Sequence, residues 1–179
     1  MPDIDSRLTG AAGEHYVICQ LIRRGYVAAQ APEGVAKMDV VASDREGNHL
    51  FAIQVKTRNA RGADGGWHMK AKHETPVVGV SFCLVDFGAD PSSPIKCYVV
   101  PSTTIAHVLS AAHQIWGRGE GKKGPRDIST EMRRLLPNYQ TANFRREGIT
   151  DADKEWISQH GPDWLIPYAE AWHLLSTKT

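Results

Sequence analysis

Two apolar segments joined by a hairpin turn constrain the fold more than any other feature of this 179-residue chain. Residues 38–43 (MDVVAS) and 49–57 (HLFAIQVKT) have the β-branched and aromatic content of strands. The SDREGN segment that links them is rich in the Asp, Gly and Asn residues of hairpin turns, which predicts antiparallel neighbours. Side chains alternate along a strand, so Gln54 and Lys56 share one face while Ile53 points to the other.

Residues 10–25 (GAAGEHYVICQLIRRG) predict a helix before this hairpin. Thr9 is the expected N-cap, and Gly25 is the expected stop at the C-terminal end. The apolar positions form one stripe on a helical wheel, namely Ala11, Val17, Ile18, Leu21 and Ile22. Glu14 falls in the middle of that stripe. A carboxylate on a buried helix face is costly unless it is paired or binds a cation, so Glu14 is a candidate for either role.

The other predicted elements complete a mixed α/β domain with a helical C-terminal layer. No internal repeat or linker divides the chain, so we expect one domain over 1–179, with a core at about 9–116 and a basic loop plus helical extension at 117–179. The remaining predicted elements are strands at 26–30, 80–87 and 96–100, a helix from Ser102 or Thr103 to about Trp116, and helices beyond residue 125 capped by Thr150 or Asp151 and by Asp163.

The composition, 41% hydrophobic and 23% charged, is that of a globular chain large enough to fold without disulfides or a structural metal. The cysteines have no CxxC spacing, and we interpret Cys19, Cys83 and Cys97 as buried free thiols in a reducing cytoplasm. The longest uncharged apolar run, 77–85, is too short to cross a bilayer, and the N-terminal segment is charged where a signal peptide is apolar. We therefore expect a cytoplasmic protein that does not insert into membranes.

Basic residues are concentrated in two blocks, although the net charge is only +1. Residues 56–76 carry five basic side chains against two acidic ones, and residues 117–134 carry six against three. Such blocks neutralise nucleic-acid phosphates, but a solvated loop has the same composition. His68 and His73 lie near the first block, where solvated histidines are commoner than phosphate contacts. The candidate nucleic-acid-binding residues are Arg58, Arg61, Lys70, Lys122, Lys123 and Arg126.

Four polar residues form the candidate site: Glu14, Asp39, Gln54 and Lys56. A carboxylate, an amide oxygen and an ammonium on adjacent strand positions suit magnesium, a hard cation that keeps water ligands. Such an ion bridges a phosphodiester oxygen and activates water, while a lysine stabilises the negative charge of the transition state. For each residue alone, a polar side chain exposed on a strand is the plain alternative.

Three segments carry a family resemblance: GAAGEHYVICQLIRRGY at 10–26, MDVV at 38–41 and AIQVKT at 52–57. With them the chain resembles the nuclease core of the PD-(D/E)XK superfamily and is similar to Holliday-junction resolvases and restriction-type endonucleases. The resemblance covers about residues 9–116. It implies a restriction-endonuclease-like αβββαβ core with a mixed sheet, and a phosphodiesterase that uses magnesium or manganese.

The resemblance also implies a role for each residue of the candidate site. Asp39 would be the motif aspartate and main metal ligand, Lys56 the motif lysine, and Glu14 the acidic residue of the first helix. Gln54 stands where the motif usually has Glu or Asp, as in a known QxK variant, and its amide removes one negative charge from the metal site. Met38 replaces the motif proline.

The sequence thus favours a magnesium-dependent endonuclease that hydrolyses DNA, with RNA as a further substrate class. Cutting two strands with one site per chain favours a homodimer. The alternative hypothesis is a nuclease-fold module that has lost catalysis through Gln54 and binds nucleic acid or a protein partner. A third hypothesis is an unrelated α/β domain whose polar residues are structural.

Overall fold

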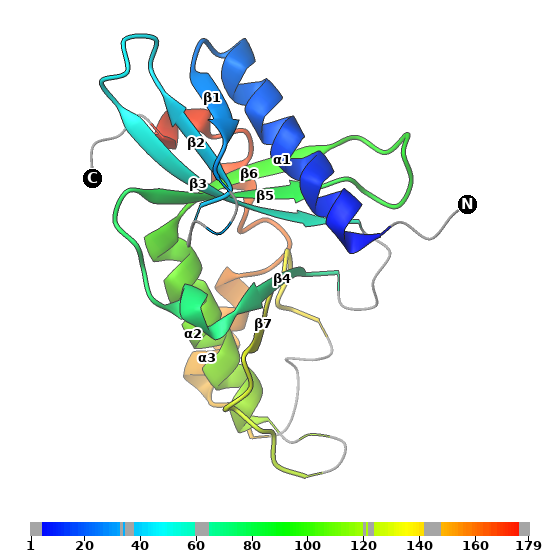
Figure 1. The fold of residues 1–179 in the computed structure, drawn as a ribbon. Helices are drawn as coiled ribbons and strands as arrows, with labels where there is room; N and C mark the ends of the chain where they lie inside the picture. The colour runs from blue at the N-terminus through cyan, green and yellow to red at the C-terminus, as the bar shows by residue number, and fades with distance from the viewer. Residues whose placement is uncertain are drawn as a thin grey trace.

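The protein is described by a computed structural model that covers residues 5–32, 34, 38–59, 65–119, 121, 124–141 and 148–175. Three α-helices, seven strands and three short 3₁₀ helices follow one another in these parts of the chain (Figure 1). Their order is α1 (Ser6–Arg23), β1 (Val27–Gln30), β2 (Val40–Ser43), β3 (Leu50–Arg58), β4 (Trp67–Lys70), η1 (Ala71–Glu74), β5 (Val80–Asp86), β6 (Lys96–Pro101), α2 (Ser102–Arg118), β7 (Met132–Leu135), α3 (Asp151–Gln159), η2 (Ile166–Tyr168) and η3 (Trp172–Leu175).

The main sheet has five strands in the order β1-β2-β3-β5-β6. The predicted hairpin is confirmed, because β2 and β3 are antiparallel with Val40 opposite Ile53. In contrast, β3 and β5 are parallel, with Gln54 opposite Phe82. A parallel pair needs a crossover connection, and β4 and η1 lie in it, where the αβββαβ order has a helix. The structure is therefore a mixed α/β fold with β3 at its centre.

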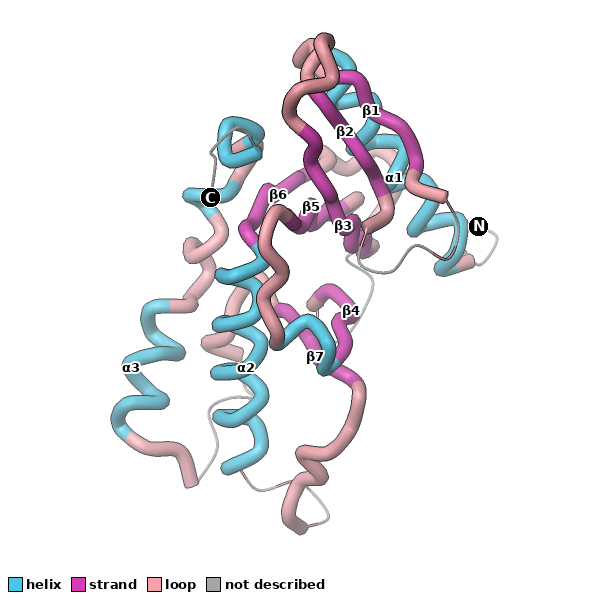
Figure 2. Tube along the Cα trace, turned by 60° about the vertical axis from the view of Figure 1, so that its left-hand side comes forward, coloured by secondary structure: helices cyan, strands magenta, loops and turns pink. Residues whose placement is uncertain are grey.

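Two apolar layers cover the two faces of this sheet. On one face, α1 packs through Val17 and Leu21 against Ile53 of β3. On the other face, α2 packs with β4 and β7 against Phe82 and Leu84 of β5. Figures 1 and 2 show α1 beside β1–β3, and α2, α3 and the β4–β7 pair at the other end of the molecule. The alternation along β3 then directs Gln54 and Lys56 away from the α1 layer.

Helix α1 begins one turn earlier than the sequence predicts. Its N-cap is Asp5, whose Oδ1 accepts a hydrogen bond from the Arg7 N–H at 2.9 Å, so the expected cap at Thr9 is wrong. The predicted stop is confirmed, because Gly25 has a φ of 89° directly after the helix. The apolar stripe is narrower than predicted, since Ile22 remains 54% exposed.

The second sheet, formed by β4 and β7, was not predicted. These strands are antiparallel, with Trp67 opposite Leu135, so the expectation of helices throughout the chain beyond residue 125 is wrong. Trp67 is fully buried, and its Nε1–H donates to the Val85 carbonyl at 2.9 Å, which ties the small sheet to the large one.

Of the three expected helix caps besides Thr9, one is confirmed. Thr150 caps α3 as predicted, through a capping box with Asp153. At α2 the cap is Pro101, and Ser102 Oγ instead accepts from the Val77 N–H at 2.9 Å. Asp163 caps no helix, because the nearby η2 begins after Leu165.

The cysteines and helices bear on two further expectations. Cys83 and Cys97 are buried free thiols as predicted, but Cys19 is exposed on α1. None of the helices in the described ranges combines the length and apolar character that crossing a membrane requires.

Candidate active site

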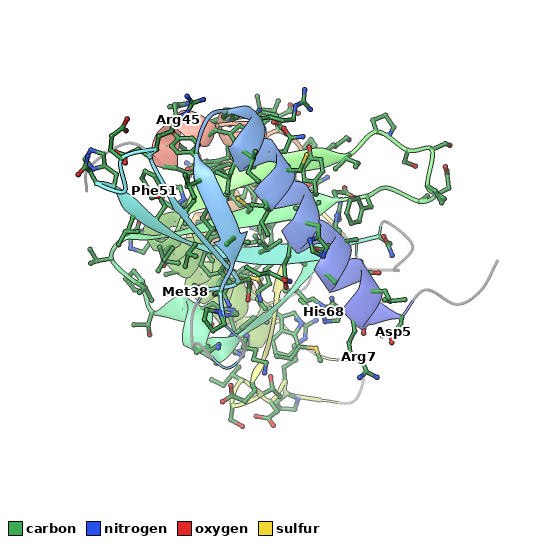
Figure 3. All side chains as sticks on the ribbon, turned by 45° about the horizontal axis from the view of Figure 1, so that its top comes forward. Asp5, Arg7, Met38, Arg45, Phe51 and His68 are labelled. Atoms are coloured by element: carbon green, nitrogen blue, oxygen red, sulfur yellow. The ribbon has the colours of Figure 1, made fainter. Side chains whose placement is uncertain are left out.

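Asp39 lies against the middle of β3. Its N–H donates to the Ile53 carbonyl at 2.9 Å, and its Oδ2 accepts from the Val55 N–H at 2.7 Å. Val55 is the residue between Gln54 and Lys56, so the carboxylate is fixed beside both of them. Figure 3 labels Met38, the residue directly before Asp39.

Glu14 reaches the same end of the sheet from α1. Its Oε2 accepts a hydrogen bond from Gln30 Nε2 at 2.8 Å. Gln30 pairs with Val40 in the β1–β2 ladder, and the next residue, Ala31, donates its N–H to the Asp39 carbonyl at 2.9 Å. Glu14 is therefore linked to Asp39 through two consecutive residues, Gln30 and Ala31.

Gly13 sets how closely α1 approaches β3 beside these residues. A Cβ atom at this position would lie 1.9 Å from Thr57 Oγ1, so only glycine fits. Gly13 precedes Glu14 and Thr57 follows Lys56. The close contact therefore positions the helix and the strand that carry the two charged groups.

Lys56 lies within the electrostatic influence of both carboxylates. Burial lowers the pKa of its ammonium below the usual lysine value, and the nearby charges of Lys72 and Lys70 lower it further. The Asp39 carboxylate, and more weakly the Glu14 carboxylate, raise this pKa and so favour the charged form. The charges of both carboxylates therefore act on Lys56, and Gln54 lies two positions before Lys56 on the same strand face.

The oxygen atoms at this place suit a divalent cation such as magnesium. Asp39 and Glu14 each use one carboxylate oxygen in the hydrogen bonds above, and within the described chain the other oxygen accepts none. Gln54, which is 7% exposed, carries a neutral amide oxygen two positions from Lys56 on β3. Magnesium prefers oxygen ligands and keeps several waters, so a set with only two carboxylates fits it. No group of three or more His, Cys, Asp or Glu side chains in the described ranges is arranged to hold a metal ion.

A pocket of about 430 Å³ adjoins Gln54 and Lys56 on the face away from α1. It lies between β3, the β4–η1 segment and the start of β7. Its lining includes Lys70, one of the candidate nucleic-acid-binding residues, together with Lys72 and His73. Figure 3 labels His68, another of its lining residues. Sequence reasoning missed this pocket because one wall belongs to the unpredicted pair of β4 and β7.

His73 is not the solvated loop residue that the sequence suggested. It is 7% exposed, packs edge-on against Phe82 at a ring distance of 5.5 Å, and accepts the Lys70 N–H at Nδ1 with a distance of 3.0 Å. Burial, followed by the charges of Lys56, Lys72 and Lys70, lowers the pKa of its imidazole to about 4. His73 is therefore a neutral imidazole at neutral pH.

The pKa of His73 predicts a loss of stability in acid. An unfolded histidine titrates near 6.5, whereas the folded value is about 4. Between these pH values the unfolded chain binds a proton that the folded protein does not, so stability falls as pH falls from 6.5 to 4, by up to about 3 kcal/mol. Urea unfolding of the unmodified protein and of His73→Asn at pH 7, 5.5 and 4.5 measures this, and the variant should lose less stability over the window. Equal losses in both proteins would assign the acid sensitivity to other groups.

Two of the three predicted phosphate-binding arginines lie in the described ranges, and both are held by other residues. Arg58 Nη2 lies 2.6 Å from Asp86 Oδ2, its guanidinium lies 4.4 Å from the centre of the Trp67 ring, and its side chain is only 13% exposed. These contacts give Arg58 a structural role, and the expected phosphate contact at Arg58 stays a prediction. Arg126 is held at the end of α2, where its Nη1 donates to the Trp116 carbonyl at 2.6 Å. Arg61, Lys122 and Lys123 lie outside the described residues.

Comparisons with known proteins give distant likenesses to two solved structures. No protein-family model matches the sequence, and no curated protein matches it at a significant level. Among solved structures, the fold is similar to the bacterial homing endonuclease I-Ssp6803I, with 19% identity, a TM-score of 0.44, and coverage of 96% of this chain and 91% of the other. It is also similar to Archaeoglobus fulgidus Hjc, a Holliday junction resolvase, with 16% identity, a TM-score of 0.40, and coverage of 71% and 83%. At these scores neither likeness says what this protein binds or cuts.

Proposed function

We propose that the protein is a metal-dependent endonuclease that hydrolyses phosphodiester bonds of DNA. The observation that carries the proposal is the position of the Asp39 carboxylate, which accepts the N–H between Gln54 and Lys56 while Glu14 approaches through Gln30. Phosphodiester chemistry needs groups of this kind: two carboxylates and an amide that can hold a metal ion, and a partly buried lysine beside a basic pocket. The motif resemblance of the three sequence segments supports the same function.

Each residue has a distinct role in this proposal. Asp39, Glu14 and Gln54 would hold magnesium or manganese through oxygen atoms, and the ion when bound supplies a Lewis acid and a water of lowered pKa. Lys56 donates an N–H to a non-bridging phosphate oxygen and offsets the negative charge that develops there. Burial works against the charged ammonium, and the neighbouring carboxylates, Asp39 first, offset part of that effect on the pKa of Lys56.

Gln54 provides the test of this function. A site with only two carboxylates should bind magnesium weakly, so cleavage should need metal in about the millimolar range. Gln54→Glu adds an anionic oxygen of nearly the same shape and should tighten metal binding about tenfold or more, whereas Gln54→Ala removes the oxygen. Calorimetric metal titration and nicking of supercoiled plasmid, single-stranded and four-way-junction DNA with magnesium or manganese measure both effects.

A matched control separates a local effect from a change in net charge. Gln114→Glu makes the same substitution on α2, where Gln114 is exposed and donates to Ser110 Oγ, and it should leave metal affinity unchanged. Equal metal binding and cleavage by the unmodified protein and Gln54→Ala would show that Gln54 is not a ligand.

The neutral Gln54 also favours a second candidate function, a nuclease-fold module that binds nucleic acid or a protein without cutting. This candidate predicts that neither the unmodified protein nor Gln54→Glu binds magnesium or manganese, although the chain still binds a partner. The same titrations therefore decide between the two functions.

A further inference from the structure

The side chains that line the pocket beside Gln54 and Lys56 carry more positive than negative charge. Lys56, Lys70 and Lys72 line it, and Glu131 is the one acidic side chain among the described lining residues. The lysines lie close enough for Lys72 and Lys70 to lower the pKa of Lys56. An excess of lysines over carboxylates in the lining of a concavity favours an anionic ligand.

His73 adds an independent sign of a ligand at the same place. Its Nδ1 accepts the Lys70 N–H, so the ring proton of the neutral imidazole is on Nε2. The side chain is more than nine-tenths buried, and Nε2 has no hydrogen-bond partner among the described residues. Buried donors are almost always satisfied in folded proteins, which makes the unpaired N–H of a residue that lines a pocket a site for an acceptor.

The pocket also has the size and position for part of a substrate strand. Its volume of about 430 Å³ is within the range of small-ligand pockets. It opens beside Lys56, the residue that faces the phosphate to be cleaved in the proposed function. Consecutive phosphates of one strand lie a nucleotide apart, so a strand held at Lys56 brings a neighbouring phosphate to this pocket.

We propose that this pocket is a subsite for a second phosphate group of the substrate strand, in which His73 Nε2–H donates to a phosphate oxygen while Lys70 and Lys72 neutralise its charge. The identity of the ligand as a nucleic-acid strand rests on the proposed function. The subsite binds and positions, and no bond is made or broken in it.

Four variants separate the contributions of His73 and of the two lysines. His73→Asn keeps an acceptor for the Lys70 N–H but lacks the Nε2 donor, whereas His73→Gln places an amide N–H near the position of Nε2. Lys70→Met and Lys72→Met remove one charge each. Lys96→Met is the matched control, because Lys96 is an exposed lysine on β6 that does not line the pocket.

Two measurements without metal test the subsite directly. In ¹⁵N-imidazole NMR, titration with inorganic phosphate and with a six-nucleotide single-stranded DNA should shift the His73 Nε2–H signal and leave His113 unchanged. In fluorescence anisotropy, His73→Asn should weaken binding of the oligonucleotide about tenfold and His73→Gln by less. Each lysine variant should reduce the slope of log affinity against log salt by about one unit, and Lys96→Met should not.

The outcomes separate the subsite from the proposed function. A His73 signal that neither titrant shifts, together with unchanged affinities in His73→Asn and Lys72→Met, would overturn the subsite even if plasmid is nicked. A shift with phosphate alone but not with the oligonucleotide would show a free-anion site and overturn the strand assignment. A shift with the oligonucleotide in a protein that cuts no DNA with either metal would uphold the subsite and reject the endonuclease.

Discussion

An Asp39→Asn variant is expected to nick plasmid DNA about a thousandfold more slowly than the unmodified protein, with almost no change in melting temperature. The asparagine Oδ1 can still accept the Val55 N–H, so the hydrogen bond that attaches this residue to β3 is kept. The negative charge is lost, and with it the strongest influence that favours the charged form of Lys56. Nicking rates at several pH values together with thermal unfolding measure both consequences.

Asp39→Ala is the companion variant. It removes the acceptor as well as the charge, leaving the Val55 N–H without its partner, so it should lose activity to the same extent and about 1–3 kcal/mol of stability in addition. If Asp39→Asn cuts DNA at the normal rate, Asp39 has only a structural role and the active site lies elsewhere.

Replacement of Gly13 by alanine should have the largest effect on stability. The added Cβ would lie 1.9 Å from Thr57 Oγ1 and 2.9 Å from Thr57 Cβ, so α1 must move away from β3. We expect a loss of about 3 kcal/mol, measured by urea unfolding, and slower cleavage because Glu14 moves with the helix.

Two further substitutions make this prediction specific. Gly10→Ala is on the same helix, where a Cβ has no heavy atom within 4 Å, and should be neutral or stabilise by up to about 1 kcal/mol. Thr57→Ala removes a buried hydroxyl that has no hydrogen-bond partner in the described chain, and combined with Gly13→Ala it should restore part of the lost stability, because alanine keeps the Cβ that lies 2.9 Å from the added atom. Equal effects of alanine at positions 10 and 13 would mean that helix propensity rather than contact with β3 matters.

The local signals in the sequence were sufficient for the main sheet. The hairpin between β2 and β3 has its turn chemistry within six residues, and the strands on either side are apolar enough to be recognised. The small sheet was missed because β4 and β7 are four residues each, alternate buried with exposed side chains, and pair across a long stretch of sequence. Nothing local to either segment indicates the other.

The same distinction between local and distant information applies to the site. Glu14 and Lys56 were identifiable because a charged residue on a buried face stands out against its helix or strand. Charge alone could not show that Arg58 is held by Asp86, since that contact spans two parallel strands. His73 had no distinguishing signal beyond its position next to Lys72, because its burial depends on Phe82 and on the turn that η1 makes after β4.

The pairing of β4 with β7 also sets the shortest fragment that can carry the pocket. A chain ending after α2 would contain Glu14, Asp39, Gln54 and Lys56, but β4 would have an open edge in place of its ladder with β7. Trp67 would lose Leu135 from its surroundings, and Lys70 would lie on a strand without a neighbour. A minimal fragment must therefore extend through residue 135. Since 132–135 hold one wall of the pocket in place, a substitution or binding event at those residues can act on the candidate active site from a distance.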